Sequence, residues 1–291
     1  MVARTSKHLS KPGVADYVIW LFLLLLCVTT LYPFLNILFV SLSDMKDVVR
    51  NGGVLLYPTS FHLDSYLYVL RYSGLLDAYK VTIFITLVGT LINLVFTSLG
   101  AYVLSIRDLP GRNALMLIVL IAMLFNGGLI PTYLVIRSLH LVNTVWALIL
   151  PFAINTWLLI LMRNFFQGIP ASLRESARID GCSELGILTR IILPLSLPIV
   201  ATLALFYGVA HWNEYTNVII YINDPKLSTL QLVLRKMYTF SIDQLDGDSL
   251  PPPVETIRAA TVMMATLPIV IVYPFLQKYF VQGVMVGSVK G

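Results

Sequence analysis

The chain has 291 residues, of which 57% are hydrophobic and only 12% charged, with a formal net charge of +5 and a mean hydropathy of +0.82. An ordinary soluble domain carries about twice this charged fraction, so the composition excludes a water-soluble globular protein. Apolar residues continue from Tyr17 to Phe280, and no polar block between them is long enough to fold separately. The composition therefore predicts one integral membrane domain over residues 1–291.

A helix needs roughly 20 apolar residues to cross the hydrocarbon core of a bilayer. Six stretches of about that length contain no Asp, Glu, Lys or Arg, and they predict an all-α fold with six transmembrane helices. They cover residues 17–42, 81–106, 113–136, 142–162, 191–210 and 259–276. The first stretch is longer than the apolar region of a secretory signal and has no small-residue cleavage site after it, so we expect a permanent anchor.

The basic residues orient these spans, because Lys and Arg favour the cytoplasmic side. With the N-terminus inside, the shorter cytoplasmic segments hold eleven of the twenty Lys and Arg residues. Both termini are then expected in the cytoplasm. The main loops are predicted to be a cytoplasmic loop 163–190, outer loops 43–80 and 211–258, and a cytoplasmic tail 277–291.

The predicted spans contain polar residues but no charged ones. Proton relays and ion-coupled carriers usually hold ionisable groups at membrane depth, so this chemistry is disfavoured. Asn93, Asn126 and Asn155 lie in the spans. Two interpretations stay open for them: hydrogen bonds between helices, or the lining of a path for a hydroxyl-rich solute.

The sequence contains no motif of an enzyme or of a cofactor site. There is no Gly-x-x-x-x-Gly-Lys-Ser/Thr loop for a nucleotide and no His-Glu-x-x-His pair for a metal, and the four histidines are scattered. We therefore predict no catalytic residue, metal, cofactor or nucleic-acid partner for this chain. A membrane protein of this kind conducts passively, senses, or takes its energy from a partner.

The stretch "ASLRESARIDG" in the loop 163–190 predicts a short charged helix. Pro170 suits the first helical position, and Gly181 suits the left-handed residue just past a helix end. A helix of about three turns is marginal alone in water, so we expect it to rest on another surface. One interpretation is a connector that lies on the lipid headgroups, and the other is contact with a soluble partner.

This stretch and the residues that follow it carry a family resemblance. Glu175-Ser176-Ala177, three residues, Gly181, nine residues and then "IILP" resemble the cytoplasmic signature E-A-A, three residues, G, nine residues, I-x-L-P of ABC importer transmembrane subunits. Ser176, in place of the middle alanine, is the one departure. The segments "LMRNFFQGIP" and "YPFLQKYFVQGVMVGSVKG" look like the MalG-like, carbohydrate-uptake branch, especially the permeases for complex oligosaccharides.

The resemblance implies a type I ABC importer fold in the bacterial cytoplasmic membrane and a role for the short helix. In such importers this helix docks into a cleft of the ATPase subunit. The residues that match this coupling role are Arg174, Glu175, Ser176, Ala177, Asp180 and Gly181, and the tail residues Gly287, Lys290 and Gly291 would point toward the ATPase. The implied partners are a second, MalF-like transmembrane subunit, two subunits that bind ATP and Mg, and an extracytoplasmic solute-binding protein.

The implied function is import of an oligosaccharide by alternating access, powered by the ATPase subunits. The candidates for the solute path are Asn126, Asn155, Trp212, Asn213 and Glu214. Trp212 also suits an interfacial anchor. Two alternatives stay open: an ABC permease for another solute, and a membrane sensor or scaffold that uses the same loop to bind a cytoplasmic partner.

Overall fold

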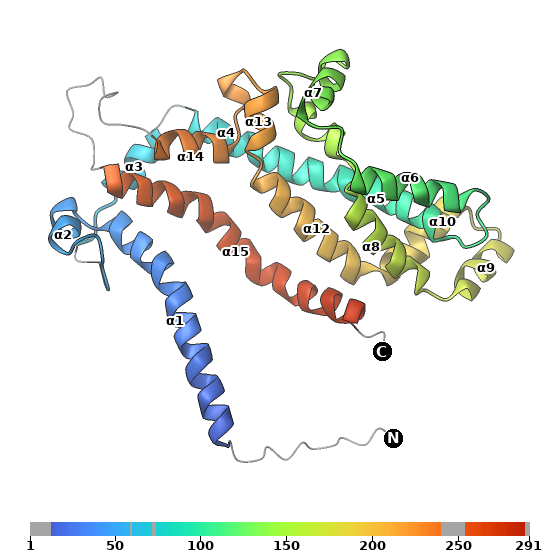
Figure 1. Cartoon of the computed structure of the whole chain (residues 1–291), viewed down its shortest axis with the longest axis horizontal. Helices are drawn as coiled ribbons and strands as arrows, with labels where there is room; N and C mark the ends of the chain where they lie inside the picture. Colours follow the sequence, from blue (N-terminus) through green and yellow to red (C-terminus); the bar gives the residue numbers. More distant parts are fainter. Residues whose placement is uncertain (1–12, 59, 72–73, 240–253, 289–291) are drawn as a thin grey trace. The chain divides into compact units, whose positions relative to one another are not determined.

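The computed structural model describes residues 13–58, 60–71, 74–239 and 254–288, and every regular element within these ranges is a helix (Figure 1). The all-α fold class is thereby confirmed. The chain divides into two compact units, Met1–Leu70 with Phe240–Met264 and Arg71–Thr239 with Ala265–Gly291. Helix α15 (Val254–Ser288) contributes residues to both units.

The first unit contains α1 (Val14–Leu42), α2 (Met45–Arg50) and α3 (Asp64–Arg71) besides the start of α15. Helix α1 is apolar on all its faces, and its large side chains are exposed from Val14 to Leu31. A helix of this kind suits a lipid environment. The small core of the unit consists of Val40, Val48, Leu55 and Ala259.

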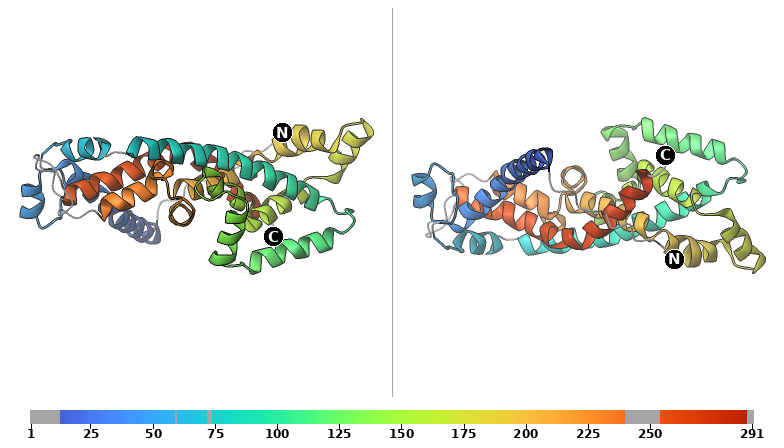
Figure 2. Two further views of the ribbon diagram at one scale, coloured as in Figure 1. Left: turned by 90° about the horizontal axis from the view of Figure 1, so that it is seen from above. Right: turned by 90° about the horizontal axis from the view of Figure 1, so that it is seen from below.

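The second unit holds the remaining helices, including two π-helical turns (η1 and η4) and three short 3₁₀ turns (η2, η3 and η5). They are α4 (Leu75–Phe84), η1 (Ile85–Gly89), α5 (Thr90–Ser105), α6 (Arg112–Leu124), α7 (Leu129–Ser138), η2 (Val145–Leu148), η3 (Leu150–Phe152), α8 (Thr156–Gln167), α9 (Ala171–Ile179), α10 (Glu184–Ile187), η4 (Leu188–Ile192), α11 (Leu193–Leu195), α12 (Leu197–Trp212), α13 (Thr216–Tyr221), η5 (Pro225–Leu227) and α14 (Leu230–Tyr238). Both views in Figure 2 show α4, η1 and α5 as one continuous rod.

Three of the predicted spans coincide with continuous helices long and apolar enough to cross a membrane: Val14–Leu42, Leu75–Ser105 and Val254–Ile271. Their ends differ from the prediction. The predicted loop 43–80 is shorter, because α4 begins at Leu75, and the predicted loop 211–258 is shorter because α15 begins at Val254. Most of the predicted tail 277–291 is also helical, because α15 continues to Ser288. Hydropathy marks the apolar part of a helix, whereas hydrogen bonding sets its ends.

The stretch predicted as a span at 113–136 is not one straight helix, because α6 and α7 meet at an angle of 115°. The break lies in "FNGG". The Oδ1 atom of Asn126 accepts a hydrogen bond from the Gly128 N–H at 2.9 Å, and Gly128 has a φ of +84°. A side-chain amide that bonds the backbone two residues on competes with the helix. Gly128 is the N-cap of α7, and glycine adopts its positive φ without the strain that a side chain would cause.

The spans predicted at 142–162 and 191–210 are also bent. The 3₁₀ turns η2 and η3 meet α8 at 48°, and the segment Glu184–Leu195 meets α12 at 87°. Pro151, Pro194 and Pro198 lie beside these bends. Proline lacks the N–H that would continue the ladder, so the chain departs from a straight helix there.

The core of the second unit is built on close packing of α5 with α8 and α12. Its buried residues include Ala101, Met162, Phe166 and Leu203. A Cβ atom on Gly100 would lie 3.0 Å from Leu159 Cδ1. The small residues on α5 therefore permit the helices to approach closely, as in other membrane bundles.

The stretch "KLSTLQLVLRKMY" forms η5 and α14. Helix α14 buries the side chains of Leu230, Val233 and Met237, and the Leu230 N–H donates to Thr82 Oγ1 of α4 at 2.8 Å. Its apolar face therefore packs within the second unit, although the amphipathic pattern alone would equally suit a membrane surface.

Candidate functional site

Helix α9 forms the centre of the candidate site, and its C-terminal end is closed by a Schellman motif. The Cys182 N–H donates to the Ala177 carbonyl at 2.9 Å, and the Gly181 N–H donates to the Arg178 carbonyl at 3.0 Å. Gly181 has a φ of +76°, as the sequence predicts for the residue past the helix end. Pro170 lies one residue before the first helical residue, Ala171, rather than at the first helical position.

The inner face of α9 is fixed to its own chain. Ala177 is only 7% exposed and belongs to the core that includes Tyr102 and Phe166. The Arg178 Nε–H donates to Glu184 Oε1 at 2.7 Å, and the Tyr102 hydroxyl donates to the second oxygen of the same carboxylate. The hydrogen bond to Glu184 raises the pKa of Arg178 above its ordinary value, so the guanidinium stays charged.

A second link joins α9 to the end of α5, because Arg174 Nη1 donates to Ser105 Oγ at 3.4 Å. Arg112 and Arg163 reach the same helix end, and the Nε–H of each donates to the Leu104 carbonyl, at 3.1 and 3.3 Å. Cations are stabilising at a helix C-terminus, where the last carbonyls have no partner within the helix. Sequence reasoning did not assign a role to Arg112 or Arg163.

The outer face of α9 is exposed. It carries Ser172, Glu175, Ser176 and Ile179, whose spacing places them on one stripe. Ile179 is 87% exposed, the highest exposed fraction among the large hydrophobic side chains of the described residues. Among the predicted coupling residues, Glu175, Ser176 and Asp180 thus lie open to a partner, whereas Ala177 packs inward.

A polar hollow of about 270 Å³ lies beside the N-terminal half of α9. Arg107, Asp108, Arg174, Glu175 and Arg178 contribute its charged groups. In Figure 1, α9 lies next to the C-terminal end of α5 and far from α7 and α13 of the same unit. The charged groups of this unit that surround α9 therefore gather at one end of it.

Gly181 provides a test of the backbone geometry of α9. A Cβ at this position would meet nothing within 4 Å, so a substitution suffers from strain and not from a clash. We expect Gly181→Val to cost about 1–2 kcal/mol, because a β-branched residue rarely adopts a left-handed φ. Gly181→Asn should cost much less, since asparagine tolerates this region. Uptake per inserted molecule checks the order glycine, asparagine, valine, and equal uptake by all three would contradict it.

The candidates for the solute path in the predicted spans make local hydrogen bonds. Asn126 shapes the break between α6 and α7, as described above. Asn155 is the N-cap of α8, and its Oδ1 accepts from the Leu158 N–H at 3.1 Å. Both side chains are exposed. Each amide therefore has a structural use, while the rest of its hydrogen-bonding capacity stays open.

Two of the candidates at the end of α12 also make local hydrogen bonds. Glu214 accepts hydrogen bonds from the backbone N–H and the side-chain amide of Asn217, both at 3.1 Å. Asn213 Nδ2 donates to the Val209 carbonyl at 2.9 Å. These bonds shape the turn into α13.

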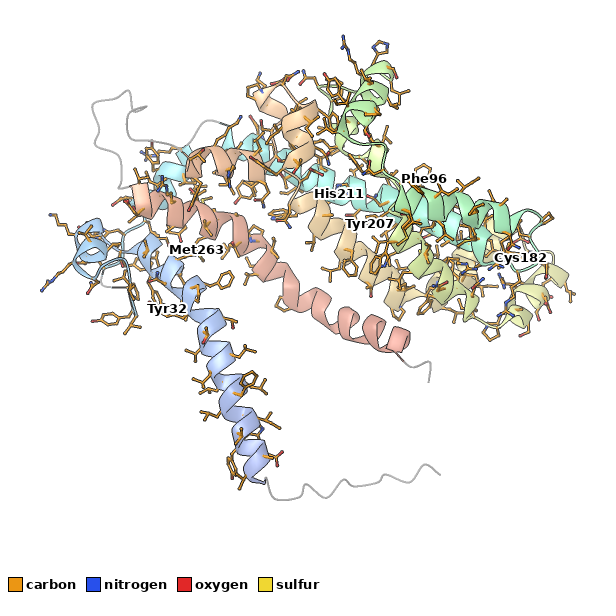
Figure 3. The ribbon with its side chains drawn as sticks, viewed as in Figure 1. Tyr32, Phe96, Cys182, Tyr207, His211 and Met263 are labelled. Atoms are coloured by element: carbon orange, nitrogen blue, oxygen red, sulfur yellow. The ribbon has the colours of Figure 1, made fainter. Side chains whose placement is uncertain are left out.

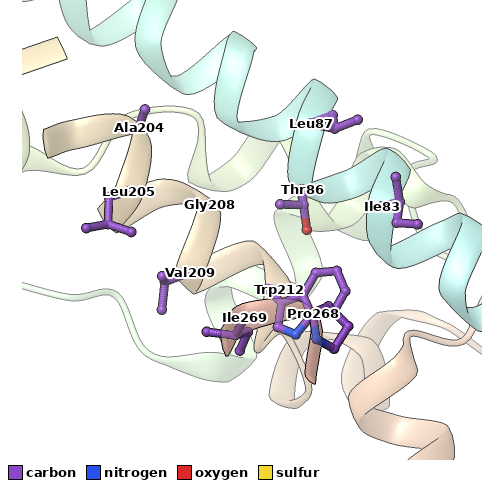
Figure 4. A pocket seen from close by; sticks show the side chains of 10 residues that line it. All are labelled: Ile83, Thr86, Leu87, Ala204, Leu205, Gly208, Val209, Trp212, Pro268 and Ile269. Carbon is purple, nitrogen blue, oxygen red and sulfur yellow. The ribbon is translucent and has the colours of Figure 1, made fainter. Parts of the chain in front are cut away.

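Trp212 lines a second hollow of about 310 Å³, which Figure 4 shows from close by. The lining is almost wholly apolar and includes Ile83, Leu87, Leu205 and Val209. The indole Nε1 is buried and has no hydrogen-bond partner in the part of the chain that the structure describes. An apolar wall of this kind does not suit a hydroxyl-rich sugar.

Only one of the three predicted tail residues lies in the part of the chain that the structure describes. Gly287 lies in α15, and Lys290 and Gly291 lie outside the described residues. The approach of the tail to an ATPase stays a prediction.

Comparison with known proteins yields consistent similarities. The model of the family described as "Binding-protein-dependent transport system inner membrane component" matches residues 110–286. The chain is 45% identical over 286 residues to the polygalacturonan/rhamnogalacturonan transport system permease protein YtcP of Bacillus subtilis, which covers 97% of this chain and 100% of that protein. It is 32% identical to the arabinooligosaccharides transport system permease protein AraQ of Halalkalibacterium halodurans, with 89% and 91% covered.

A solved structure is similar over almost the whole length. It is the crystal structure of a bacterial ABC transporter involved in the import of the acidic polysaccharide alginate. The superposition has a TM-score of 0.84 with 32% sequence identity, and it covers 93% of this chain and 99% of that chain.

Proposed function

We propose that this chain, which belongs to the family of binding-protein-dependent transport system inner membrane components, imports an oligosaccharide by alternating access driven by ATP hydrolysis on partner subunits. The observation that carries the coupling role is the two-sided build of α9. Its inner face is tied to the chain by Ala177, Arg174 and Arg178, while Glu175 and Ile179 stand exposed on the outer face.

Such a helix acts as a lever. A partner that moves α9 through its outer stripe also pulls on α5, because Arg174 contacts Ser105 and Glu184 accepts from Tyr102. The Schellman motif stiffens the other end of α9, where the chain continues into α10 and then α12. A rigid connection transmits displacement to the membrane helices, whereas a flexible loop would absorb it.

The proposed assembly contains this chain, a second MalF-like membrane subunit, two ATPase subunits that hold ATP and Mg, and an extracytoplasmic binding protein. The single integral domain would cross the bacterial cytoplasmic membrane six times, with both termini in the cytoplasm. The three bent helix pairs each count as one span in this proposal, which the lengths of the helices support. Glu175, Ser176 and Asp180 would contact the ATPase, and the catalytic work would lie wholly in the partner.

The names of the similar proteins guide the choice of solute. YtcP is a polygalacturonan/rhamnogalacturonan transport system permease and AraQ is an arabinooligosaccharide transport system permease. The transporter in the solved structure is involved in the import of alginate. All three solutes are polysaccharides or oligosaccharides. We therefore propose a fragment of a polysaccharide as solute, and fragments of polygalacturonan are the first to test.

Reconstitution tests the proposed function. The complex of the four kinds of subunit is placed in liposomes, and ATP hydrolysis and import are measured with fragments of polygalacturonan, alginate and arabinan and with a monosaccharide. We expect one oligosaccharide to stimulate hydrolysis about tenfold, which corresponds to about 1.4 kcal/mol of preferential stabilisation of the closed ATPase. Stimulation by the monosaccharide alone would favour a permease for another solute. Failure of this chain to copurify with an ATPase would favour the sensor or scaffold.

A further inference from the structure

Two side chains of α12 support the break between η3 and α8, one by a direct hydrogen bond and the other through Asn93 of α5. The first is Tyr207, which is buried and labelled in Figure 3. Its hydroxyl accepts a hydrogen bond from the backbone N–H of Asn155 at 3.1 Å and lies 2.7 Å from Thr97 Oγ1 of α5. Tyr207 thus satisfies the backbone donor of the N-cap residue of α8.

The second side chain is His211, one turn further along α12. Its Nε2 lies 2.7 Å from Asn93 Oδ1, and Asn93 Nδ2 donates to the Phe152 carbonyl at 2.7 Å. A carbonyl can only accept, so the Asn93 amide nitrogen must face Phe152 and its oxygen must face His211. His211 therefore donates from Nε2.

The chain makes room for this pair at Gly89, the last residue of the π-helical turn η1. A Cβ on Gly89 would lie 2.6 Å from His211 Nε2 and 2.8 Å from Cε1. The imidazole therefore occupies the space that a side chain at this position would need. π-helical turns within α-helices are frequent at functional sites.

The two links meet at one feature, the segment Phe152–Asn155. The Asn93 amide donates to the Phe152 carbonyl at the start of the segment, and the Tyr207 hydroxyl accepts from the Asn155 N–H at its end. Irregular backbone at membrane depth occurs where it is buried in protein or lines a water-filled cavity, and not against lipid. Ile154 and Asn155 are exposed on this segment, and the indole of Trp157 follows at 50% exposure.

We propose that Asn93, Tyr207 and His211 are positioning residues that hold the break Phe152–Asn155 as one wall of the solute path. The inference rests on the proposed oligosaccharide import. Interrupted helices near the middle of the membrane form the solute sites of many transporters. The exposed amide of Asn155 offers hydrogen bonds to sugar hydroxyls, and Trp157 offers an apolar ring face.

The test compares import with ATP hydrolysis in the same liposomes that hold the whole complex, with a labelled polygalacturonan fragment as probe. Tyr207→Phe removes the hydroxyl and keeps the ring. We expect the number of sugar molecules imported per ATP hydrolysed to fall about fivefold or more, the loss that an unmet hydrogen bond of a buried group produces. Tyr133→Phe is the matched control, because the Tyr133 ring stacks on Tyr221 of the same unit and is not one of the groups that bond Phe152 or Asn155. It should leave the ratio within about twofold.

His211 gives an independent variant pair. The side-chain amide of His211→Gln can still donate to Asn93, so this variant should keep most of the ratio, whereas His211→Leu should lose it. A purely structural role would lower import and hydrolysis together through the amount of folded complex, and an unchanged ratio in Tyr207→Phe and His211→Leu would overturn the inference. Wild-type complex that imports none of the oligosaccharides would instead overturn the proposed function.

Discussion

We expect Glu175→Lys to abolish measurable uptake while the chain still inserts in the membrane. Glu175 is exposed on the outer stripe of α9, and in the proposed function it contacts the ATPase. Reversing a charge at such a contact costs about 3 kcal/mol, which lowers the affinity for the ATPase roughly a hundredfold. Copurification of the ATPase and uptake by whole cells measure the two effects.

Two variants sharpen this experiment. Glu175→Gln removes the charge without reversing it and should lie between wild type and Glu175→Lys. Asp64→Lys makes the same reversal on an exposed carboxylate of α3, in the segment expected on the outer side, and should keep its ATPase. Full uptake by Glu175→Lys would contradict the docking of α9.

Gly89→Ala is expected to destabilise the chain by about 2–3 kcal/mol, although alanine is normally the better helix former. The added methyl group would lie 2.6 Å from His211 Nε2, so the ring must move and its hydrogen bond to Asn93 must lengthen or break. The midpoint of thermal unfolding of the complex in lipid nanodiscs should fall accordingly.

Gly208→Ala is the matched control for this change. Gly208 lies in α12, and a Cβ there would have Thr90 Oγ1 as its nearest neighbour, at an ordinary 3.7 Å. This variant should be neutral or slightly stabilising. The double variant Gly89→Ala with His211→Ala should recover part of the lost stability, because the smaller side chain leaves room for the methyl group. Equal midpoints for Gly89→Ala and Gly208→Ala would refute the close contact.

The bends show why part of the fold was not visible in the sequence. Asn126-Gly127-Gly128 and the prolines at 151, 194 and 198 are all uncharged, so a window that searches for apolar length passes over them. Whether such residues break a helix depends on partners for the backbone groups that the break sets free. At Phe152 and Asn155 these partners are Asn93 and Tyr207, which lie 59 and 52 residues away in the chain.

The candidate site, too, could be predicted from the sequence only in part. The spacing of Glu175, Ala177 and Gly181 was readable, and the left-handed conformation of Gly181 confirms the predicted helix end. The direction in which each residue of α9 faces was not readable. A nine-residue helix has no long apolar stripe, so only its contacts with α5 and α10 show that Ala177 packs inward and Ile179 points out.

The sequence by itself determined that this protein is an all-helical membrane chain and, through one loop signature, to which family of transport proteins it is related. These properties depend on composition and on spacing along the chain, which are local. Only the tertiary structure decided where the spans bend, which face of α9 is open, and that His211 joins Asn93 across the space left by Gly89. These depend on which distant backbone and side-chain groups meet, because a polar group buried at membrane depth must find its hydrogen-bond partner within the folded chain.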